Sequence, residues 1–106
     1  MILSGGVNVY PKDTEDIIYS MPEVQDAAVI GVPHKKWGEA VHAVVVCREG
    51  ATLTVAEVTD LCRERLAPFQ VPAAVEFRSE LPRNPSGKLL KRVLRAEFWD
   101  DQDVKV

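Results

Sequence analysis

The chain has 106 residues, of which 46% are hydrophobic and 27% are charged, and its formal net charge is -3. This composition is typical of one soluble globular domain, small beside most enzymes that act on two substrates. The acidic balance argues against a nucleic-acid partner or an anionic membrane surface, because such binding depends on many basic contacts. A basic cluster near the C-terminus still permits a small anionic ligand: Arg83, Lys88, Lys91, Arg92 and Arg95.

The sequence carries no recognisable signal for secretion, membrane spanning or metal binding. The first residues have no basic region or long apolar stretch, and the longest apolar run, 43–47, is too short to cross a bilayer. His34 and His42 are isolated, and neither they nor Cys47 and Cys62 have zinc spacing. We therefore expect a cytoplasmic protein with two reduced thiols, no transmembrane segment and no metal site of its own.

The first predicted elements are two short extended pieces over residues 2–10, joined at Gly5 and Gly6. Pro11 fits the first turn of a helix, where its missing N–H costs nothing, and Pro22 ends that helix. Asp13, Glu15 and Asp16 lie in the first turns of this helix, where carboxylates are favourable because they are near the helix N-terminus. One apolar face at helical spacing comprises Thr14, Ile17, Ile18 and Met21.

The middle of the chain predicts two strands and a second helix. Residues 27–32 form a short apolar run, and residues 40–47 form a longer, valine-rich run that ends at a turn. Thr54 and Glu57 make a capping-box pattern at the start of a helix that Pro68 ends. The predicted core positions of this helix are Val55, Val58, Leu61, Cys62 and Leu66.

The last predicted elements are a strand over residues 74–77, a Pro/Gly-rich loop over residues 81–88 and an amphipathic helix. The residues expected to face inward from this helix are Leu90, Val93, Leu94 and Phe98. This order of elements predicts an α+β fold, in which helices flank a small three-stranded sheet and a two-stranded hairpin precedes them.

The segment Leu81 to Arg92, LPRNPSGKLLKR, contains the strongest candidate for a catalytic residue. Two prolines stiffen the loop, and Gly87 gives the backbone freedom just before Lys88, which can present its ammonium group to phosphate or carboxylate oxygens. A Walker-type phosphate loop is excluded, because the upstream glycine is absent and Leu89 stands where Ser or Thr must bind magnesium. On these residues alone, Lys88 can also be an ordinary solvated lysine.

Two further segments draw attention. SGGVNVYP, residues 4–11, contains a Gly-Gly pair that permits positive φ and close approach of a ligand, although a plain hairpin turn explains it as well. In GVPHKKWGEAVHAVVV, residues 31–46, we expect Gly38 to form a tight turn and Glu39 to start a strand or to tie a loop by hydrogen bonds. His34 is expected to be a turn residue rather than a base, since nothing beside it would tune it.

In the order and spacing of these three segments, the chain resembles the adenylate-forming superfamily of acyl- and aryl-CoA synthetases, luciferases and peptide-synthetase adenylation domains. The resemblance implies that Lys88 contacts the carboxylate and the α-phosphate side of the forming acyl-adenylate. Gly87 and Arg83 are the residues expected to support its loop.

The same resemblance assigns the second segment to CoA. It implies that Ser4, Gly5 and Gly6 form a hairpin that swings into the active site for thioester formation and lines the route of the pantetheine arm. The family's usual glutamate is replaced by Asp13, which keeps the acidic character but is one methylene shorter.

For the whole chain, the resemblance implies that residues 1–106 are the mobile C-terminal domain of an acyl-CoA ligase, with a glycine-rich hairpin at 1–11 and a catalytic-lysine loop at 81–92. The substrate would be a carboxylic acid of fatty-acyl or aryl type. ATP, Mg2+ and CoA would be held mainly with an N-terminal adenylation domain of the same chain, joined by a hinge just before Met1. The isolated chain would then be inactive. The alternative is a free-standing, non-catalytic docking or regulatory module with the same fold.

Overall fold

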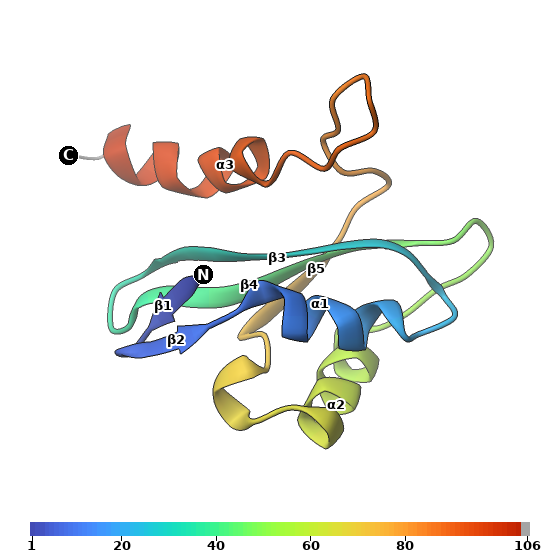
Figure 1. The fold of residues 1–106 in the computed structure, drawn as a ribbon, viewed down its shortest axis with the longest axis horizontal. Helices are drawn as coiled ribbons and strands as arrows, with labels where there is room; N and C mark the ends of the chain where they lie inside the picture. The colour runs from blue at the N-terminus through green and yellow to red at the C-terminus, as the bar shows by residue number, and fades with distance from the viewer. Residues whose placement is uncertain (105–106) are drawn as a thin grey trace.

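A computed structural model describes residues 1–104 of the chain. Within that range the chain forms five strands, three α-helices and one short 3-10 helix (Figure 1). In chain order the elements are β1 (Ile2–Ser4), β2 (Val7–Val9), α1 (Pro11–Tyr19), β3 (Val24–His34), β4 (Gly38–Cys47), α2 (Val55–Arg65), η1 (Pro68–Gln70), β5 (Ala74–Phe77) and α3 (Lys91–Val104).

Strand β4 is the centre of the sheet. One of its edges pairs antiparallel with β3 over the full length of both strands, from Val24 opposite Cys47 to His34 opposite Gly38. Its other edge pairs in parallel with β5 and, at Ser4 opposite Gly38, antiparallel with β1. The α+β fold and the N-terminal hairpin are confirmed. The sheet has five strands rather than three within the described residues, because the β1–β2 hairpin joins it through this one β1–β4 pair.

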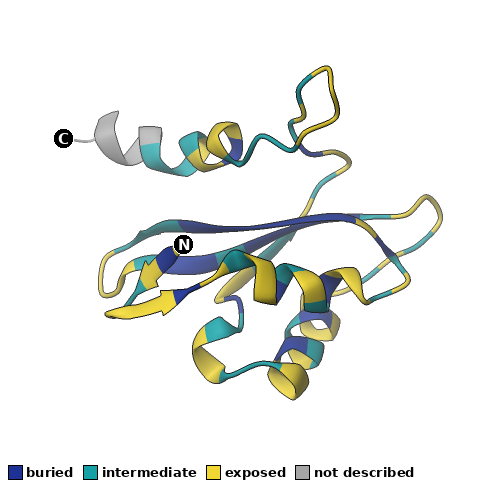
Figure 2. Cartoon of the chain, in the orientation of Figure 1, coloured by how far each residue is buried: buried dark blue, intermediate teal, exposed yellow. Residues whose placement is uncertain are grey.

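The sheet is covered on both faces, which gives three layers. Helices α1 and α2 pack on one face, and α3 with the preceding loop packs on the other (Figures 1 and 2). Alternate residues of β3 and β4 face opposite sides, so the continuous apolar runs of these strands supply both cores. The core under α1 and α2 includes Ile2, Val9, Ile18, Val29, Val45, Val58 and Cys62. The core under α3 comprises Ala28, Ile30, Val44, Val46, Leu81 and Leu94.

The helix starts follow the local sequence signals. Thr54 caps α2, because its Oγ1 accepts the Glu57 N–H at 3.2 Å and the Glu57 carboxylate accepts the Thr54 N–H at 2.9 Å. Helix α1 begins at Pro11 and buries Thr14, whose hydroxyl donates to the Gln70 carbonyl at 2.9 Å. This bond satisfies a polar group in the core and ties α1 to η1.

Two of the expected core residues are instead on the surface. Val55 is 46% exposed, because it is the first residue of α2 and lies outside the contact that Val58 and Cys62 make with the sheet. Val93 is 42% exposed, whereas Leu94 is fully buried and Phe98 packs against the same core. Residues four apart lie on one side of a helix, and Val93 is displaced from that side.

No helix in the described part of the chain is long and apolar enough to cross a membrane.

Candidate functional site

The lysine loop, residues 81–90, is a tight hairpin held by its own backbone. Arg83 and Leu89 form an antiparallel bridge, and the Leu90 N–H donates to the Pro82 carbonyl at 2.9 Å. At the tip, the Asn84 N–H donates to the Lys88 carbonyl at 3.0 Å. Backbone hydrogen bonds therefore hold the two arms of the loop together both at its base and near Lys88.

The side chain of Asn84 organises the tip of this loop. Its Oδ1 accepts the backbone N–H groups of Ser86 at 3.1 Å and of Lys88 at 2.9 Å. Gly87 has a φ of +88° and donates its N–H to the Asn84 carbonyl at 2.9 Å. Gly87 is suited to this position because other residues rarely adopt positive φ. Asn84 was not singled out by the sequence analysis, although Asn is a frequent residue in such turns.

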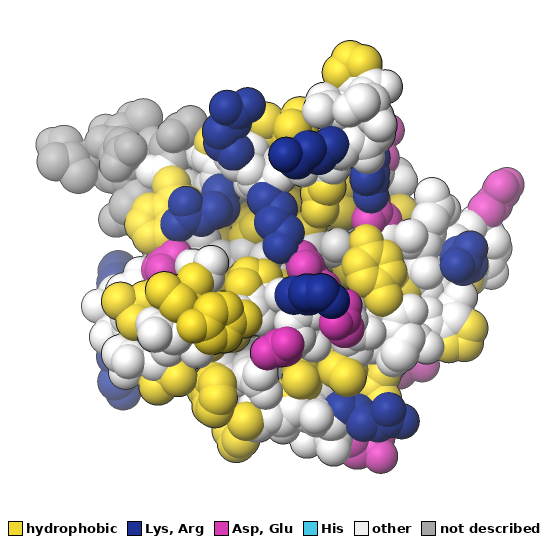
Figure 3. Space-filling view, viewed as in Figure 1, with side chains coloured by type: hydrophobic (Ala, Val, Ile, Leu, Met, Phe, Trp, Pro, Cys, Tyr) yellow, Lys and Arg dark blue, Asp and Glu magenta, His cyan; other side chains and the backbone are white. Residues whose placement is uncertain are grey.

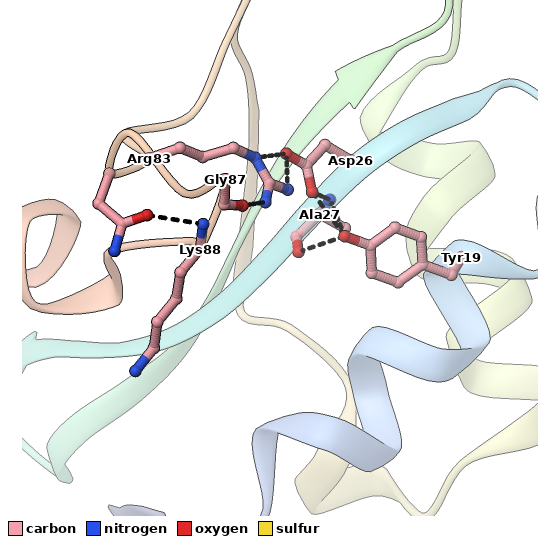
Figure 4. Close-up of polar contacts among 7 residues, drawn as sticks. Tyr19, Asp26, Ala27, Arg83, Gly87 and Lys88 are labelled. Carbon is pink, nitrogen blue, oxygen red and sulfur yellow. Dashed lines mark hydrogen bonds and ion pairs between the residues drawn. The ribbon is translucent and has the colours of Figure 1, made fainter.

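Lys88 combines a fixed backbone with a free side chain. Its main-chain N–H and carbonyl are both hydrogen bonded within the loop, while its side chain is exposed and forms no ion pair with any residue in 1–99. In Figure 4 the ammonium group points away from the neighbouring Arg83. The loop thus presents a charged amine to whatever approaches this end of the molecule.

Arg83 anchors the lysine loop to the sheet. Its guanidinium donates to Asp26 Oδ2 through Nη2 at 2.5 Å and Nε at 3.2 Å, and to the Gly87 carbonyl through Nη1 at 2.6 Å (Figure 4). Asp26 lies in β3 and is almost fully buried. The expected supporting role of Arg83 therefore has a specific geometry: one side chain grips both the loop and the sheet.

Tyr19 completes this network from α1. Its hydroxyl donates to Asp26 Oδ1 at 2.5 Å and accepts the Ala27 N–H at 3.1 Å. Burial and the hydrogen bond to Asp26 raise the pKa of Tyr19, so its hydroxyl remains a donor to the carboxylate. The hydrogen bond and the charge of Asp26 raise the pKa of Arg83, so its guanidinium stays charged. Asp26 and Tyr19 were not predicted, because no local pattern marks them.

Other cations of the C-terminal cluster hold α3 in place. Lys91 pairs with Glu15 of α1 at 2.6 Å, and Arg95 pairs with Glu39 of β4 at 3.1 Å. Figure 3 shows basic side chains gathered over the side of the molecule formed by α3 and the lysine loop. Of the five clustered cations, Lys88 and Arg92 form no ion pair within residues 1–99.

The Gly5-Gly6 turn has the backbone that a two-residue hairpin requires. Both glycines have positive φ, +57° and +83°, as in the turns that match the twist of paired strands. The Gly5 N–H donates to the Trp37 carbonyl at 3.0 Å, whereas a Cβ added to Gly6 would meet nothing within 4 Å. The turn is a regular hairpin, and its tip is open to an approaching molecule.

An open, largely apolar cavity of about 690 Å3 lies beside this turn. Ser4 and Gly5 line it together with Trp37, Arg63 and Phe69. Trp37 and Phe69 are among the exposed large apolar residues of the chain. The glycine pair marks Ser4 and Gly5 in the sequence, whereas no local pattern marks Phe69 and Arg63, which come from a segment about sixty residues away.

The hairpin turn and the lysine loop lie far apart. In Figure 1 the β1–β2 turn is at one end of the sheet, while the loop before α3 projects from the other end and from the opposite face. The structure therefore does not bring Ser4, Gly5 and Gly6 together with Lys88. The two predicted sites are two separate surfaces of one domain.

The middle segment is structural in its contacts. His34 Nδ1 accepts the N–H groups of Lys36 and Trp37, both at 3.1 Å, and the imidazole stacks on the Trp37 ring with centroids 4.1 Å apart. Gly38 has a φ of +82°, and Glu39 accepts the Leu3 N–H at 3.0 Å. These contacts agree with a turn role for His34 and a tying role for Glu39. Asp13 receives one long bond, from Gln70 Nε2 at 3.4 Å.

Among the described residues, no group of three His, Cys, Asp or Glu side chains could hold a metal ion. Cys47 and Cys62 are free thiols, and burial raises the pKa of Cys62.

Comparison with known proteins places these features in a family. The model of the AMP-binding enzyme C-terminal domain matches residues 13–88. A CoA ligase of Rhodococcus jostii, named for a methyl-dioxo-octahydroindenyl propanoyl group, is 50% identical over 97 residues, which is 92% of this chain and 19% of that protein. A long-chain fatty acid–CoA ligase of Mycobacterium tuberculosis is 44% identical over 98 residues, again 92% of this chain and 19% of the relative.

The solved structures that the chain resembles agree with this family match. A fatty acyl-CoA synthetase of Mycobacterium tuberculosis superposes with a TM-score of 0.87 at 44% identity, covering 92% of this chain and 19% of that one. ATP-bound MatB from Rhodopseudomonas palustris gives a TM-score of 0.88 at 48% identity, covering 92% and 20%. The chain thus spans about a fifth of the length of the relatives that it matches.

Proposed function

The chain belongs to the family of AMP-binding enzyme C-terminal domains, and from this premise we propose that it is the mobile C-terminal domain of an ATP-dependent acyl-CoA ligase. In the first half-reaction a carboxylate attacks the α-phosphorus of ATP, which forms an acyl-adenylate and releases pyrophosphate. In the second half-reaction the thiol of CoA attacks the acyl carbon and releases AMP. The observation that carries the proposal is the free ammonium group of Lys88 on a braced loop.

Lys88 serves the first half-reaction. A carboxylate and a phosphate are both anionic, so their approach is opposed by repulsion, and negative charge grows on the bridging oxygens as the reaction proceeds. A cation held at that point offsets the charge, and it does so best when its position is set before the reaction. Asn84 and Arg83 fix the backbone of Lys88, while the absence of a competing ion pair within residues 1–99 leaves its charge available.

The hairpin serves the second half-reaction. Its open Gly5-Gly6 tip allows a thiol-bearing arm to pass close to bare backbone. The adjoining cavity offers the exposed aromatic surfaces of Trp37 and Phe69 and one cation, Arg63, to a ligand with an adenine ring and phosphates. Because the hairpin and Lys88 lie at opposite ends of the domain, the domain must rotate relative to the N-terminal adenylation domain between the two half-reactions.

The remaining components are assigned to an N-terminal adenylation domain of the same chain. In this proposal Mg2+, the triphosphate of ATP and the acid are held mainly there. The relatives include ligases for fatty acids and a feruloyl-CoA synthase, which supports a fatty-acyl or aryl acid as substrate. The free thiols Cys47 and Cys62 fit a cytoplasmic enzyme.

The name of one relative gives an acyl carrier protein, and not CoA, as the acceptor of the acyl group. A fatty acid–acyl-carrier-protein ligase of Streptomyces coeruleorubidus is 44% identical over 105 residues. We favour CoA because the cavity beside the hairpin offers room and ring surfaces for a free nucleotide. Both acceptors carry a phosphopantetheine thiol, so the hairpin would serve either.

The test is an assay of both half-reactions with the full-length protein that contains this chain. We expect acid-dependent ATP–pyrophosphate exchange, and thioester formation when CoA is added. The 106-residue chain alone should fold and show neither activity, because in this proposal the acid and the triphosphate are held mainly by the N-terminal domain. ATP–pyrophosphate exchange catalysed by the isolated chain would refute the assignment of the acid and the triphosphate to the N-terminal domain. A full-length protein without exchange activity for any fatty or aryl acid would favour a non-catalytic module.

A further inference from the structure

The base of the β1–β2 hairpin is anchored by Ile2 and Val9, which are buried in the core, but beyond this base the hairpin has few hydrogen bonds to the rest of the described residues. Its pairing with the sheet consists of Ser4 opposite Gly38, next to the bond from the Gly5 N–H to the Trp37 carbonyl. A hairpin of three-residue strands is marginal by itself. Ile2 and Val9 hold the base, so the direction of the tip depends in addition on the few hydrogen bonds that reach the hairpin from outside.

Glu39 supplies one of these contacts. Its Oε2 accepts the N–H of Leu3, the middle residue of β1, at 3.0 Å. In an antiparallel ladder every second residue turns its N–H away from the partner strand, and Leu3 donates its N–H to this carboxylate. The other oxygen, Oε1, accepts Arg95 Nη2 of α3 at 3.1 Å. One carboxylate thus joins the hairpin to the helix that follows the lysine loop.

The surroundings of Glu39 are built to hold it. Its side chain is only 18% exposed. Gly31 lies against it, and a Cβ added to Gly31 would overlap Glu39 Oε1 and force the carboxylate to shift. Trp99 donates its ring N–H to the Gly31 carbonyl at 2.9 Å, and the Arg95 guanidinium lies 5.0 Å from the Trp99 ring centroid. These contacts restrain both the carboxylate and its cationic partner.

From these contacts we infer that Glu39 is a positioning residue for the thioester half-reaction: its carboxylate fixes the direction of β1 and so places the Gly5-Gly6 tip on the route of the thiol acceptor. The inference rests on the function proposed above. Glu39 touches no reacting atom in this scheme and acts through the Leu3 amide. The lysine loop is held by a separate network, Arg83 with Asp26. A change at Glu39 also removes the Arg95 pair of α3, but this helix keeps the Lys91–Glu15 pair and the core around Leu94, so the adenylation end should stay in place.

Three variants of the full-length protein test this inference. Glu39→Ala removes the acceptor of the Leu3 N–H, Glu39→Gln keeps an oxygen for it but loses the charge, and Glu49→Ala removes an exposed carboxylate in the turn after β4 as a matched control. The readouts are ATP–pyrophosphate exchange, thioester formation from supplied acyl-adenylate, and hydrogen exchange of the Leu3 amide.

We expect Glu39→Ala to slow thioester formation by about 10- to 100-fold, as for a misplaced reacting geometry, while pyrophosphate exchange stays within about twofold. The Leu3 amide should exchange faster in the same protein. Glu39→Gln should restore most of both properties, and Glu49→Ala should match the unchanged protein.

Three results would overturn the inference: equal loss of both half-reactions in Glu39→Ala, a Leu3 amide that exchanges as in the unchanged protein, or a Glu39→Gln variant as impaired as Glu39→Ala. Failure of the proposed function is a different result. In that case the unchanged protein itself forms no thioester, and the amide exchange still decides whether Glu39 holds the hairpin.

Discussion

Lys88 lies where a rigid backbone meets a free side chain, and this contrast decides how it can act. The neighbouring side chains Asn84 and Arg83 form their hydrogen bonds with the backbone of the loop and with Asp26. None of them neutralises the lysine. A preorganised cation of this kind stabilises developing charge without the cost of reorganising at the moment of reaction.

Lys88→Ala in the full-length protein should therefore reduce adenylate formation by about 10²-fold, the size found when other preorganised charge stabilisers are removed. Thioester formation from supplied acyl-adenylate should change far less, because the repulsion between carboxylate and phosphate has by then been overcome. Pyrophosphate exchange and thioester release measure the two steps, and Lys36→Ala, an exposed lysine in the turn between β3 and β4, is the control. Equal losses in both steps would mean that Lys88 is structural.

Substitution of Arg83 should also reduce adenylation more than thioester formation, but by displacing Lys88 and not by removing its charge. Arg83→Met leaves the loop sequence around Lys88 intact but frees it from Asp26, and we expect adenylation to fall about 10-fold or more through misplacement of the lysine. Asp26→Asn keeps the shape and one acceptor and should lose less. Steady-state exchange rates of the two variants give the comparison. If Arg83→Met keeps full exchange activity, the network is not needed to position Lys88.

At the scale of elements, the hairpin and α3 are both additions to a sheet that β3, β4 and β5 make by themselves. The hairpin is held at its base and by Glu39, and α3 is held by the apolar core around Leu94 and by ion pairs. The hairpin carries the proposed acceptor end and α3 follows the loop that carries Lys88, so the two ends can be altered separately.

Gly6→Leu tests the hairpin end. A side chain at Gly6 would project into open space, so it should block the acceptor rather than disturb the fold, apart from about 1 kcal/mol for a non-glycine residue at positive φ. We expect near-normal pyrophosphate exchange and a strong loss of thioester release. Exchange measured on the same preparation reports whether the domain is folded. Unchanged CoA kinetics would remove the hairpin from the acceptor route.

For the whole molecule, a charge network ties three separate elements together. His42 of β4 contacts Glu76 of β5 at 2.8 Å, and Arg78 bridges Glu76 at 3.2 Å to Glu97 of α3 at 3.0 Å. Burial acts to raise the pKa of Glu76, but hydrogen bonds from His42 and Arg78 outweigh it, so the pKa of Glu76 lies below its ordinary value of 4.5.

This network predicts a loss of stability in acid. A carboxyl group whose pKa is lower in the folded state stabilises the fold fully above the ordinary pKa, and this contribution disappears as the pH falls through the lowered value. The free energy of unfolding of the chain should thus decrease below about pH 4.5, and the difference between the unchanged chain and Glu76→Gln should shrink there. Urea unfolding at pH 7, 5, 4 and 3 measures both. A difference that stays constant with pH would contradict this origin.

The sequence by itself determined the elements and the two candidate ends of the molecule. The apolar runs in β3 and β4, the Thr54 capping box and the prolines after α1 and α2 are local signals, and the structure follows them to within a few residues. The Gly5-Gly6 turn and the loop around Gly87 were predictable for the same reason, because positive φ is a property of a single residue. The family resemblance rested on the same short segments, and the match over residues 13–88 confirms it.

Only the tertiary structure decided which residues support those ends. The Arg83–Asp26 pair joins positions 57 residues apart, and Glu39 reaches Leu3 and Arg95 across 36 and 56 residues. No periodic pattern marks such partners, because their meeting depends on strand register and on where α3 lands on the sheet. For the same reason, the sequence could not predict that Phe69 lies beside the hairpin or that Lys88 is far from Gly5 and Gly6. These relations exist only once the sheet has brought distant segments to their edges and faces.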